Sequence, residues 1–494
     1  MHTKKQKIRE VNMNYILILN FNTFVSKTIA KLLRNNNIYT IILNGNTPAD
    51  KTIDPNCKGI IICGDYAGSV AGLELDKVWL SFDIPILALG SCAVAVNIML
   101  GGQTSDEIIS NKIEDIHYYD DDYSVLKKHT HAIVHAKELF PAEKMIPFAY
   151  INNNVCIEVK HEQKEIFCIQ RSFERNDPYS IEMINGFAKE ICKCAANWDL
   201  DEFVDETIAE IKEKYSNYNI ICAVSGGLDS AVCSYIFKQA LGNAVKCVFI
   251  NTGFLRVNEE EEIVDFYKNI IKLDIDYIDA KEKFFNAIAD VSDNILKIKI
   301  VRDLLSQTLM SRIVNPDNTL LVLGSNYNES LLHNPSLDIS KNINVRYEIL
   351  YPLKNLFKFE IKQIAKKFML PESIYSKPFP SAGLATSIIG KVNSTRLEMI
   401  KRIYEIYSNE ITSCNLDKKI SNYGAKLLPF RNLENIYEVH LNAIQDTQSL
   451  VSYAFRMPFD LLERVTDEIL KEYPNIVRHV LYEVTPYEAT SYLD

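Results

Sequence analysis

The sequence predicts an α/β protein with two doubly wound, mostly parallel-sheet domains followed by a smaller α+β domain. From residue 14 to about 190, and again from 219 to about 385, short apolar runs alternate with helical patterns. This alternation is the signature of a parallel sheet covered by helices. After residue 386 helices and strands follow without Gly-rich turns. We therefore expect domains at 14–192, 197–385 and 386–494.

The individual elements follow from the period of the apolar residues. In the first block we expect strands at Ile16–Asn20, Tyr39–Leu43, Gly59–Cys63 and Ile84–Leu89, and helices at Val25–Leu33 and Ala93–Leu100. A charged helical stretch at 197–218 leads into the second block, whose expected strands are 219–224, 245–251 and 319–323.

The composition excludes several classes of protein. An apolar fraction of 47% with 24% charged residues is an ordinary globular balance. A net charge of −10 argues against general nucleic-acid binding. No apolar run reaches the ~18 residues of a membrane span, and the apolar run after the basic N-terminus is too short for a signal peptide. We therefore expect a cytoplasmic protein whose eleven cysteines are mostly buried free thiols.

The segment Ser225–Ser230, with the sequence Ser-Gly-Gly-Leu-Asp-Ser, is the most informative motif. An apolar run precedes it, and a helical pattern ending at Gly242 follows it. Strand, Gly-rich turn and helix in this order aim backbone N–H groups and a helix dipole at one point, which suits a phosphate. Ser225 and Ser230 can add hydroxyl donors, and Asp229 is either a helix cap or a carboxylate for a metal.

The motif lacks the lysine of the loops that serve γ-phosphate transfer. It resembles the pyrophosphatase loop of N-type ATP pyrophosphatases, which cleave ATP between the α and β phosphates. Over nearly the whole chain the sequence resembles the GMP synthetase family, the glutamine amidotransferases that aminate XMP. Four blocks carry this resemblance in the family's order: Lys246–Glu259, Tyr351–Glu360, Lys377–Leu384 and Met457–Arg464.

The resemblance implies a set of site residues, with ATP and Mg²⁺ as cofactors. The phosphates of ATP and the metal would be held by Ser225, Gly226, Gly227, Leu228, Asp229, Ser230 and Ala231. Asp229 would bind the metal, Ile250 would border the adenine, and Lys358 would contact a phosphate; a solvated surface lysine is the alternative for Lys358.

The first domain resembles a class I glutamine amidotransferase that has lost glutamine hydrolysis. The nucleophile Cys92 is present, but Val94 replaces the elbow glycine of the family. Ser172 stands at the position of the base histidine, which leaves only Glu174 of that pair, and Asp65 stands in the oxyanion loop. A carboxylate there repels the charge that the loop should stabilise. The clustered His129, His131 and His135 are expected at the surface rather than as a substitute base.

The acceptor end also departs from the family. The cations that grip the XMP phosphate are largely replaced, for example by Ser387. Lys377, Arg431 and Thr490 remain as candidate contacts, with a surface arginine at a dimer contact as the alternative for Arg431. Each lost charge-assisted contact costs roughly 1.5–3 kcal/mol. The acceptor is therefore either XMP held by other residues or a different molecule.

The leading interpretation is a ligase that aminates a purine nucleotide, by resemblance XMP, through an adenylated intermediate. Free ammonia, rather than glutamine, would be the nitrogen donor, and a homodimer is expected from the family. Two alternatives stay open: an ATP pyrophosphatase acting on another acceptor, and a pseudoenzyme that binds nucleotide without catalysis. Neither nucleic acid nor a membrane is an expected partner.

Overall fold

The computed structural model describes residues 13–50, 53–64, 73–119, 122–127, 130–171, 178–326, 348–372, 374, 383–431, 433, 435–446 and 452–485. The chain forms two compact units, one up to Asp199 and one from Leu200 onward. Both are α/β, with a smaller, mostly antiparallel sheet near the end of the second, so the predicted fold class is confirmed. In the described part of the chain, no helix combines the length and apolarity that a membrane crossing requires.

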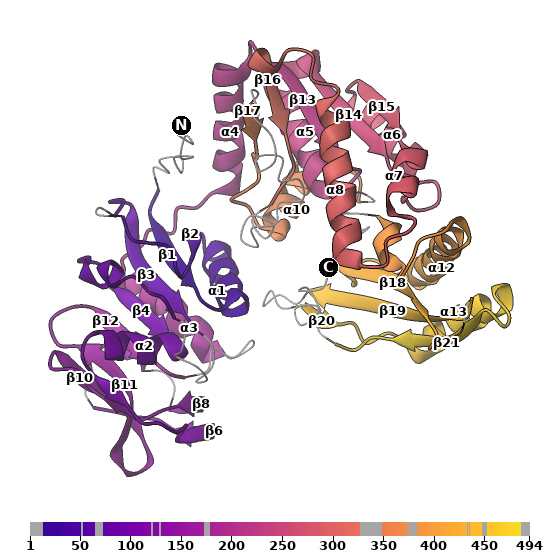
Figure 1. Ribbon diagram of the computed structural model, residues 1–494. Helices are drawn as coiled ribbons and strands as arrows, with labels where there is room; N and C mark the ends of the chain where they lie inside the picture. Colours follow the sequence, from indigo (N-terminus) through magenta and orange to yellow (C-terminus); the bar gives the residue numbers. More distant parts are fainter. Residues whose placement is uncertain are drawn as a thin grey trace. The chain divides into compact units, whose positions relative to one another are not determined.

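The first unit is built on an eight-stranded sheet (Figure 1). Its order is β2 (Tyr39–Asn44), β1 (Tyr15–Asn20), β3 (Cys57–Cys63), β4 (Ile86–Leu89), β12 (Ile166–Ile169), β11 (Val155–His161), β10 (Met145–Ile151) and β7 (His117–Tyr118). The first five strands are parallel, and the last three continue antiparallel. Two small antiparallel pairs join β5 (Gln103–Thr104) with β9 (Leu139–Phe140) and β6 (Ser110–Asp115) with β8 (His131–Ala136).

Three α-helices accompany this sheet: α1 (Thr23–Asn35), α2 (Ser91–Met99) and α3 (Pro178–Gly186). Helix α1 begins where the side chain of Asn22 accepts a hydrogen bond from the backbone N–H of Val25, a normal N-cap. Helix α2 starts directly after β4 and packs against β4 and β12. The Ile- and Leu-rich runs thus form the parallel half of the sheet, as predicted.

The second unit contains a five-stranded parallel sheet. Its order is β15 (Ile275–Asp279), β14 (Val245–Asn251), β13 (Asn219–Val224), β16 (Thr319–Val322) and β17 (Glu348–Leu350). Its helices are α4 (Leu200–Tyr215), α5 (Leu228–Leu241), α6 (Glu259–Asp265), α7 (Lys281–Ile288), α8 (Asn294–Met310) and α10 (Lys358–Lys367). Helices α4, α5 and α10 contact one another, and both α5 and α8 contact β14.

The strand order places β13 in the centre of this sheet. The chain goes from β13 to β14 on one side, and β16 joins β13 on the other. The connections leaving β13 and entering β16 therefore diverge, which is the topological switch point where open α/β sheets bind ligands, at the carboxyl ends of the strands.

The last part of the second unit is a sheet of β18 (Asn422–Pro429), β19 (Tyr437–Asp446), β20 (Ser452–Ala454) and β21 (Val477–Tyr482). It is packed with α12 (Ser394–Ser413) and α13 (Phe459–Glu472). One hydrophobic core joins Phe254, Phe284 and Val301 with Ile400, Tyr407 and Leu441. The predicted boundary at 385 therefore falls inside a continuous core, and the three-domain division stays a prediction.

Candidate functional site

The segment Ser225–Ser230 lies at the carboxyl end of β13, as the sequence predicted. Strand β13 ends at Val224, and α5 begins at Leu228 with Gly227 as its N-cap residue. Among the described residues, no side chain makes a capping hydrogen bond at the start of α5. Because the first N–H groups of a helix have no intrahelical acceptor, these groups are available to an anion.

Two glycines allow the loop to take this shape. Gly226 has a φ of +77°, and a Cβ there would lie 2.4 Å from the side chain of Ile263 in α6. Gly324, which follows β16, approaches the loop so closely that a Cβ would lie 2.7 Å from the backbone N of Ser230. A larger residue at either position would force the phosphate loop or its neighbour to move.

Hydrogen bonds between serine hydroxyl groups and the backbone stabilise the conformation of the loop. Ser230 Oγ donates to the carbonyl oxygen of Gly227 at 2.9 Å and accepts from the N–H of Ser225 at 3.3 Å. The hydroxyls of Ser225 and Ser230 lie 3.4 Å apart. Ser230 thus stabilises the loop conformation, and the two hydroxyls stand together at the start of α5.

Asp229 forms an ion pair across the unit. Both of its carboxylate oxygens lie 2.9 Å from Nζ of Lys358, the first residue of α10. The amide of Asn326 donates to Oδ2 of Asp229 at 3.0 Å. The Asp229 side chain is 11% exposed and that of Lys358 is 46% exposed. The Asp229 carboxylate thus has Lys358 and Asn326 as partners, and its role, helix cap or carboxylate for a metal, stays a prediction.

The loop opens into a pocket of about 240 Å³ within the second unit. Ser225, Gly227, Asp229, Ser230 and Lys358 line its polar end. The remaining wall is mostly apolar and comes from β14, the turn after it, α8 and the ends of β13 and β16: Ala223, Val224, Val248, Phe249, Ile250, Leu255, Val301, Leu305, Leu309 and Leu323. A polar, cation-bearing end beside an apolar slot suits a nucleotide, with its phosphates at the loop and its base in the slot.

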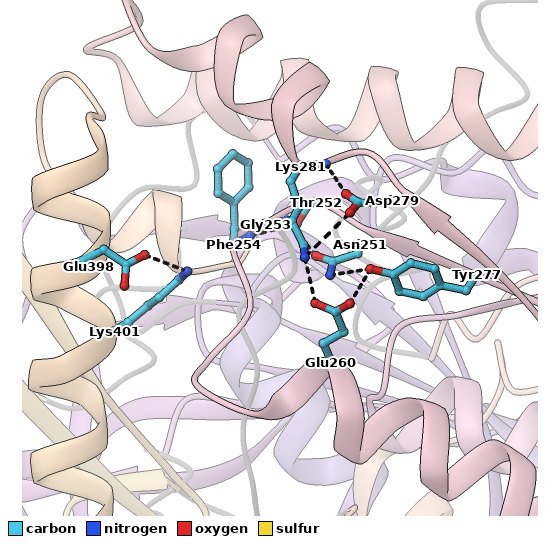
Figure 2. A network of polar contacts seen from close by, with 10 residues as sticks. All are labelled: Asn251, Thr252, Gly253, Phe254, Glu260, Tyr277, Asp279, Lys281, Glu398 and Lys401. Atoms are coloured by element: carbon cyan, nitrogen blue, oxygen red, sulfur yellow. Dashed lines mark hydrogen bonds and ion pairs between the residues drawn. The ribbon is translucent and has the colours of Figure 1, made fainter.

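A hydrogen-bonded cluster shapes the wall that follows β14 (Figure 2). Asn251 donates to the hydroxyl of Tyr277 at 3.1 Å and accepts from the N–H of Gly253 at 2.8 Å. Glu260 accepts from Tyr277 and pairs with Lys281 Nζ at 3.0 Å. Burial alone would raise the pKa of Glu260, but the hydrogen bonds from Tyr277 and Lys281 hold it below its ordinary value. The cluster fixes the turn whose Thr252 and Leu255 line the pocket.

The donor set suits Mg²⁺, the metal that the sequence implies. Magnesium prefers hard oxygen ligands, and it is usually held by one or two carboxylates together with substrate phosphates. Asp229 provides one carboxylate at the pocket, and Ser225 and Ser230 line the same pocket. Within the described residues, no cluster of three or more His, Cys, Asp or Glu forms a separate metal cage.

Comparisons with known proteins find relatives of this chain. A family model described as NAD synthase matches residues 200–422, the part that contains the pocket. GMP synthase (glutamine-hydrolyzing) of Caldanaerobacter subterraneus subsp. tengcongensis is 27% identical over 503 residues, covering 95% of this chain and 97% of the relative. The protein of the same name from Caldicellulosiruptor saccharolyticus is 28% identical over 502 residues, with the same coverage. That of Petrotoga mobilis is 26% identical, covering 96% of this chain and 98% of the relative.

The chain is homologous to the GMP synthases over nearly its whole length. The resemblance to the GMP synthetase family is thereby confirmed, and so is the predicted enzyme class, a ligase. The GMP synthetase homology covers both units, since the alignments span at least 95% of the chain.

Only some of the other predicted site residues lie at the pocket. Gly226 lies in the loop and Ala231 in α5, and neither is among the pocket-lining residues, whereas Ile250 lines the pocket. Arg431 is exposed at the turn after β18, has a φ of +53°, and stacks on Phe430 with 5.0 Å between the guanidinium carbon and the ring centroid. It is not among the pocket-lining residues. Glu174, Lys377 and Thr490, like Asp65 and Ser172, lie outside the described residues.

Cys92 sits at the start of α2 in the first unit, after Gly90. Its side chain is buried. Burial raises the pKa of the Cys92 thiol well above its ordinary value, and the neighbouring Cys63 and Cys168 raise it further. These influences favour the thiol, whereas a cysteine nucleophile requires the thiolate. His131, one of the clustered histidines, is exposed and pairs with Asp115 at 2.6 Å.

Sequence reasoning missed several residues of the site. The apolar wall from α8 carries no motif, because its three residues are ordinary members of an apolar helix face. Asn326, which contacts Asp229, lies four residues after the last residue of β16. The strand order brings the carboxyl ends of β13 and β16 to one sheet edge, but nothing in the sequence around Asn326 indicates this contact.

Proposed function

We propose that this chain uses ATP to activate a carbonyl group of a purine nucleotide as an adenylate, which ammonia then aminates. XMP is the proposed acceptor and GMP the product, because the relatives named GMP synthase align over nearly the whole chain. The observation that carries the proposal is the phosphate loop joined to an apolar slot, with Asp229 and Lys358 paired at their junction.

The reaction divides into two displacements. The acceptor's carbonyl oxygen attacks the α-phosphorus of ATP, and pyrophosphate leaves. Ammonia then adds to the activated carbon, and AMP leaves with the oxygen that the acceptor supplied. The proton released by the attacking nitrogen goes to solvent or to the phosphate of AMP.

The residues of the loop hold the phosphates during the first step. The N–H groups at the start of α5 and the hydroxyls of Ser225 and Ser230 bind the pyrophosphate portion. Lys358 has a long, half-exposed side chain, so its ammonium group can contact the phosphates as negative charge develops on the leaving group. Asp229 would hold Mg²⁺, which when bound stabilises the charge of the departing pyrophosphate.

We propose further that free ammonia is the nitrogen source. The support is the buried thiol of Cys92, whose pKa burial raises well above its ordinary value, together with the absence of the family's base histidine at Ser172 and elbow glycine at Val94. The test is glutamate release from glutamine while ATP and acceptor are being consumed. We expect AMP formation with ammonium chloride and little glutamate from glutamine. Glutamate formation that disappears in Cys92→Ala would contradict this part of the proposal.

The acceptor is tested with a panel of purine monophosphates. AMP and pyrophosphate are expected in equal amounts with XMP, and in smaller amounts with IMP or GMP. Arg431→Ala is expected to raise the KM for XMP about tenfold, the scale of one lost charge-assisted contact. AMP formation with another nucleotide but not with XMP would reassign the acceptor and keep the ATP chemistry. We also propose that the protein is a homodimer in the cytoplasm.

A further inference from the structure

We propose that Asn326 is a positioning residue for the reaction, holding the Asp229 carboxylate in the orientation that receives the cation of the nucleotide complex. This inference rests on the proposed use of ATP with a divalent metal, and it adds a residue that the pyrophosphatase loop motif does not contain.

The contact is direct and shielded from solvent. The Asn326 residue is 6% exposed, and its Nδ2 donates to Asp229 Oδ2 at 3.0 Å. The same carboxylate is bound by Lys358, whose Nζ lies 2.9 Å from both of its oxygens. The Asp229 carboxylate therefore accepts hydrogen bonds from an amide that follows β16 and from an ammonium group in α10.

The fold brings Asn326 to Asp229 by pressing the chain after β16 onto the first turn of α5. Gly324 contacts that turn so closely that a Cβ would lie 2.8 Å from the carbonyl carbon of Asp229. One residue before it, the carbonyl oxygen of Leu323 lies 4.0 Å from Sγ of Cys233 in α5. Asn326 follows two residues after this close approach, and its short side chain reaches the carboxylate with little freedom to move.

The two partners of Asp229 differ in what they can do. Lys358 has a flexible stem and is nearly half exposed, so it can leave the carboxylate for a phosphate when a nucleotide binds. Asn326 is buried and short, so it stays. The amide then keeps one oxygen of Asp229 fixed after the lysine has moved, and the carboxylate does not have to be reordered when the cation arrives. Such fixed orientation by a supporting residue is how functional groups are held ready.

The test measures metal binding in the absence of turnover. We use Mn²⁺ as the probe, followed by its electron paramagnetic resonance, with α,β-methylene-ATP, an analogue that resists cleavage between the α and β phosphates. Two variants remove the donor: Asn326→Leu keeps the volume of the side chain, and Asn326→Ala does not. Asn318→Ala is the matched control, because it removes an amide that donates to the Asn217 carbonyl at 3.1 Å, at the opposite end of β16.

We expect both Asn326 variants to bind Mn²⁺ in the ternary complex about tenfold more weakly, the scale of one lost hydrogen bond to a charged group. The Asn326 variants should bind the analogue without metal about as well as the wild type does. The melting temperature of the Asn318→Ala control should change little. Wild-type Mn²⁺ affinity in Asn326→Leu would overturn the inference, whether or not Asn326→Ala is impaired, because shape alone would then explain the residue. If the wild type binds neither the analogue nor Mn²⁺ with it, the proposed function fails instead.

Discussion

At the scale of the residue, Asp229 is the carboxylate among the described residues that line the pocket. Its pair with Lys358 is half exposed on the lysine side, and exposed pairs contribute only about 0–1 kcal/mol to stability. The pair therefore matters more for the site than for the fold. This separation of roles allows a variant to test chemistry without unfolding the protein.

Asp229→Asn is expected to lower the rate of AMP formation by about 100-fold or more, the usual scale for removing one electrostatic stabiliser of a transition state. The melting temperature should shift by no more than a few degrees. Stopped-time assays of AMP and pyrophosphate with calorimetry measure both quantities. Asp290→Asn is the control, since it breaks another aspartate–lysine pair, with Lys391 at 3.1 Å, on an exposed surface. Rates in Asp229→Asn within threefold of the wild type would remove Asp229 from the site.

Cys92 makes a second prediction at this scale. Its buried thiol, with a pKa well above the ordinary value, should react slowly with iodoacetamide at pH 7.5, whereas the exposed Cys414 should react fastest. Mass spectrometry of the native protein after brief alkylation is expected to find the label mainly on Cys414. The denatured protein, in which all eleven cysteines are accessible, is the control. Preferential labelling of native Cys92 would indicate an activated thiolate and revive the glutaminase hypothesis.

At the scale of the element, the local patterns predicted the strand and the helix that flank the phosphate loop, and most of the parallel strands of the two large sheets. The strand before the phosphate loop, the loop itself and the end of α5 at Gly242 follow from apolar period and glycine placement, and β13 and α5 have the expected bounds. These features depend on neighbouring residues only, which is why the sequence alone reveals them.

The contacts between distant elements could not be predicted in this way. Asn326 and Asp229 are 97 residues apart in the sequence, and nothing local in Gly324–Asn326 indicates a carboxylate nearby. The antiparallel strands β10 and β11 also went unpredicted, because their mixed apolar and polar residues lack the Ile-rich signature of the parallel strands. Packing at long range decides both features.

Lys297 in α8 provides the prediction for this scale. It is fully buried, and its Nζ donates to the carbonyl oxygens of Ile388 and Gly390 at 2.6 and 2.5 Å, which ties α8 to the chain after Gly383. Burial, with a smaller contribution from Arg396, lowers the pKa of Lys297 to about 8. Between pH 8 and its ordinary value of about 10.5 the unfolded chain binds the proton and the folded chain does not.

The contribution of Lys297 to the free energy of unfolding therefore rises with pH in this window, by up to about 1.4 kcal/mol per pH unit. The measurement is the free energy of unfolding in urea for the wild type minus that of Lys297→Met, between pH 7 and 10. Taking the difference cancels the titration of the buried cysteines and tyrosines. We expect the difference to change in favour of the wild type above pH 8. A difference that is flat with pH would show that Lys297 keeps an ordinary pKa.

At the scale of the whole molecule, the two units differ in how many features of the expected active sites they contain. The second unit has the loop, the paired charges and an apolar slot in one pocket. The first unit keeps the sheet and the position of Cys92, but the environment of that thiol opposes ionisation. We therefore propose that the second unit carries out ATP-dependent amination and that the first unit has no glutaminase role.

The central claim is that an oxygen of the acceptor becomes adenylated. It is tested by labelling the carbonyl oxygen at C2 of XMP with ¹⁸O and analysing the products by mass spectrometry, with ATP and ammonium chloride. The account predicts one ¹⁸O atom in the phosphate of AMP for each molecule of GMP formed, since AMP leaves with the acceptor's oxygen. Unlabelled AMP, or ADP with phosphate in place of AMP with pyrophosphate, would contradict it.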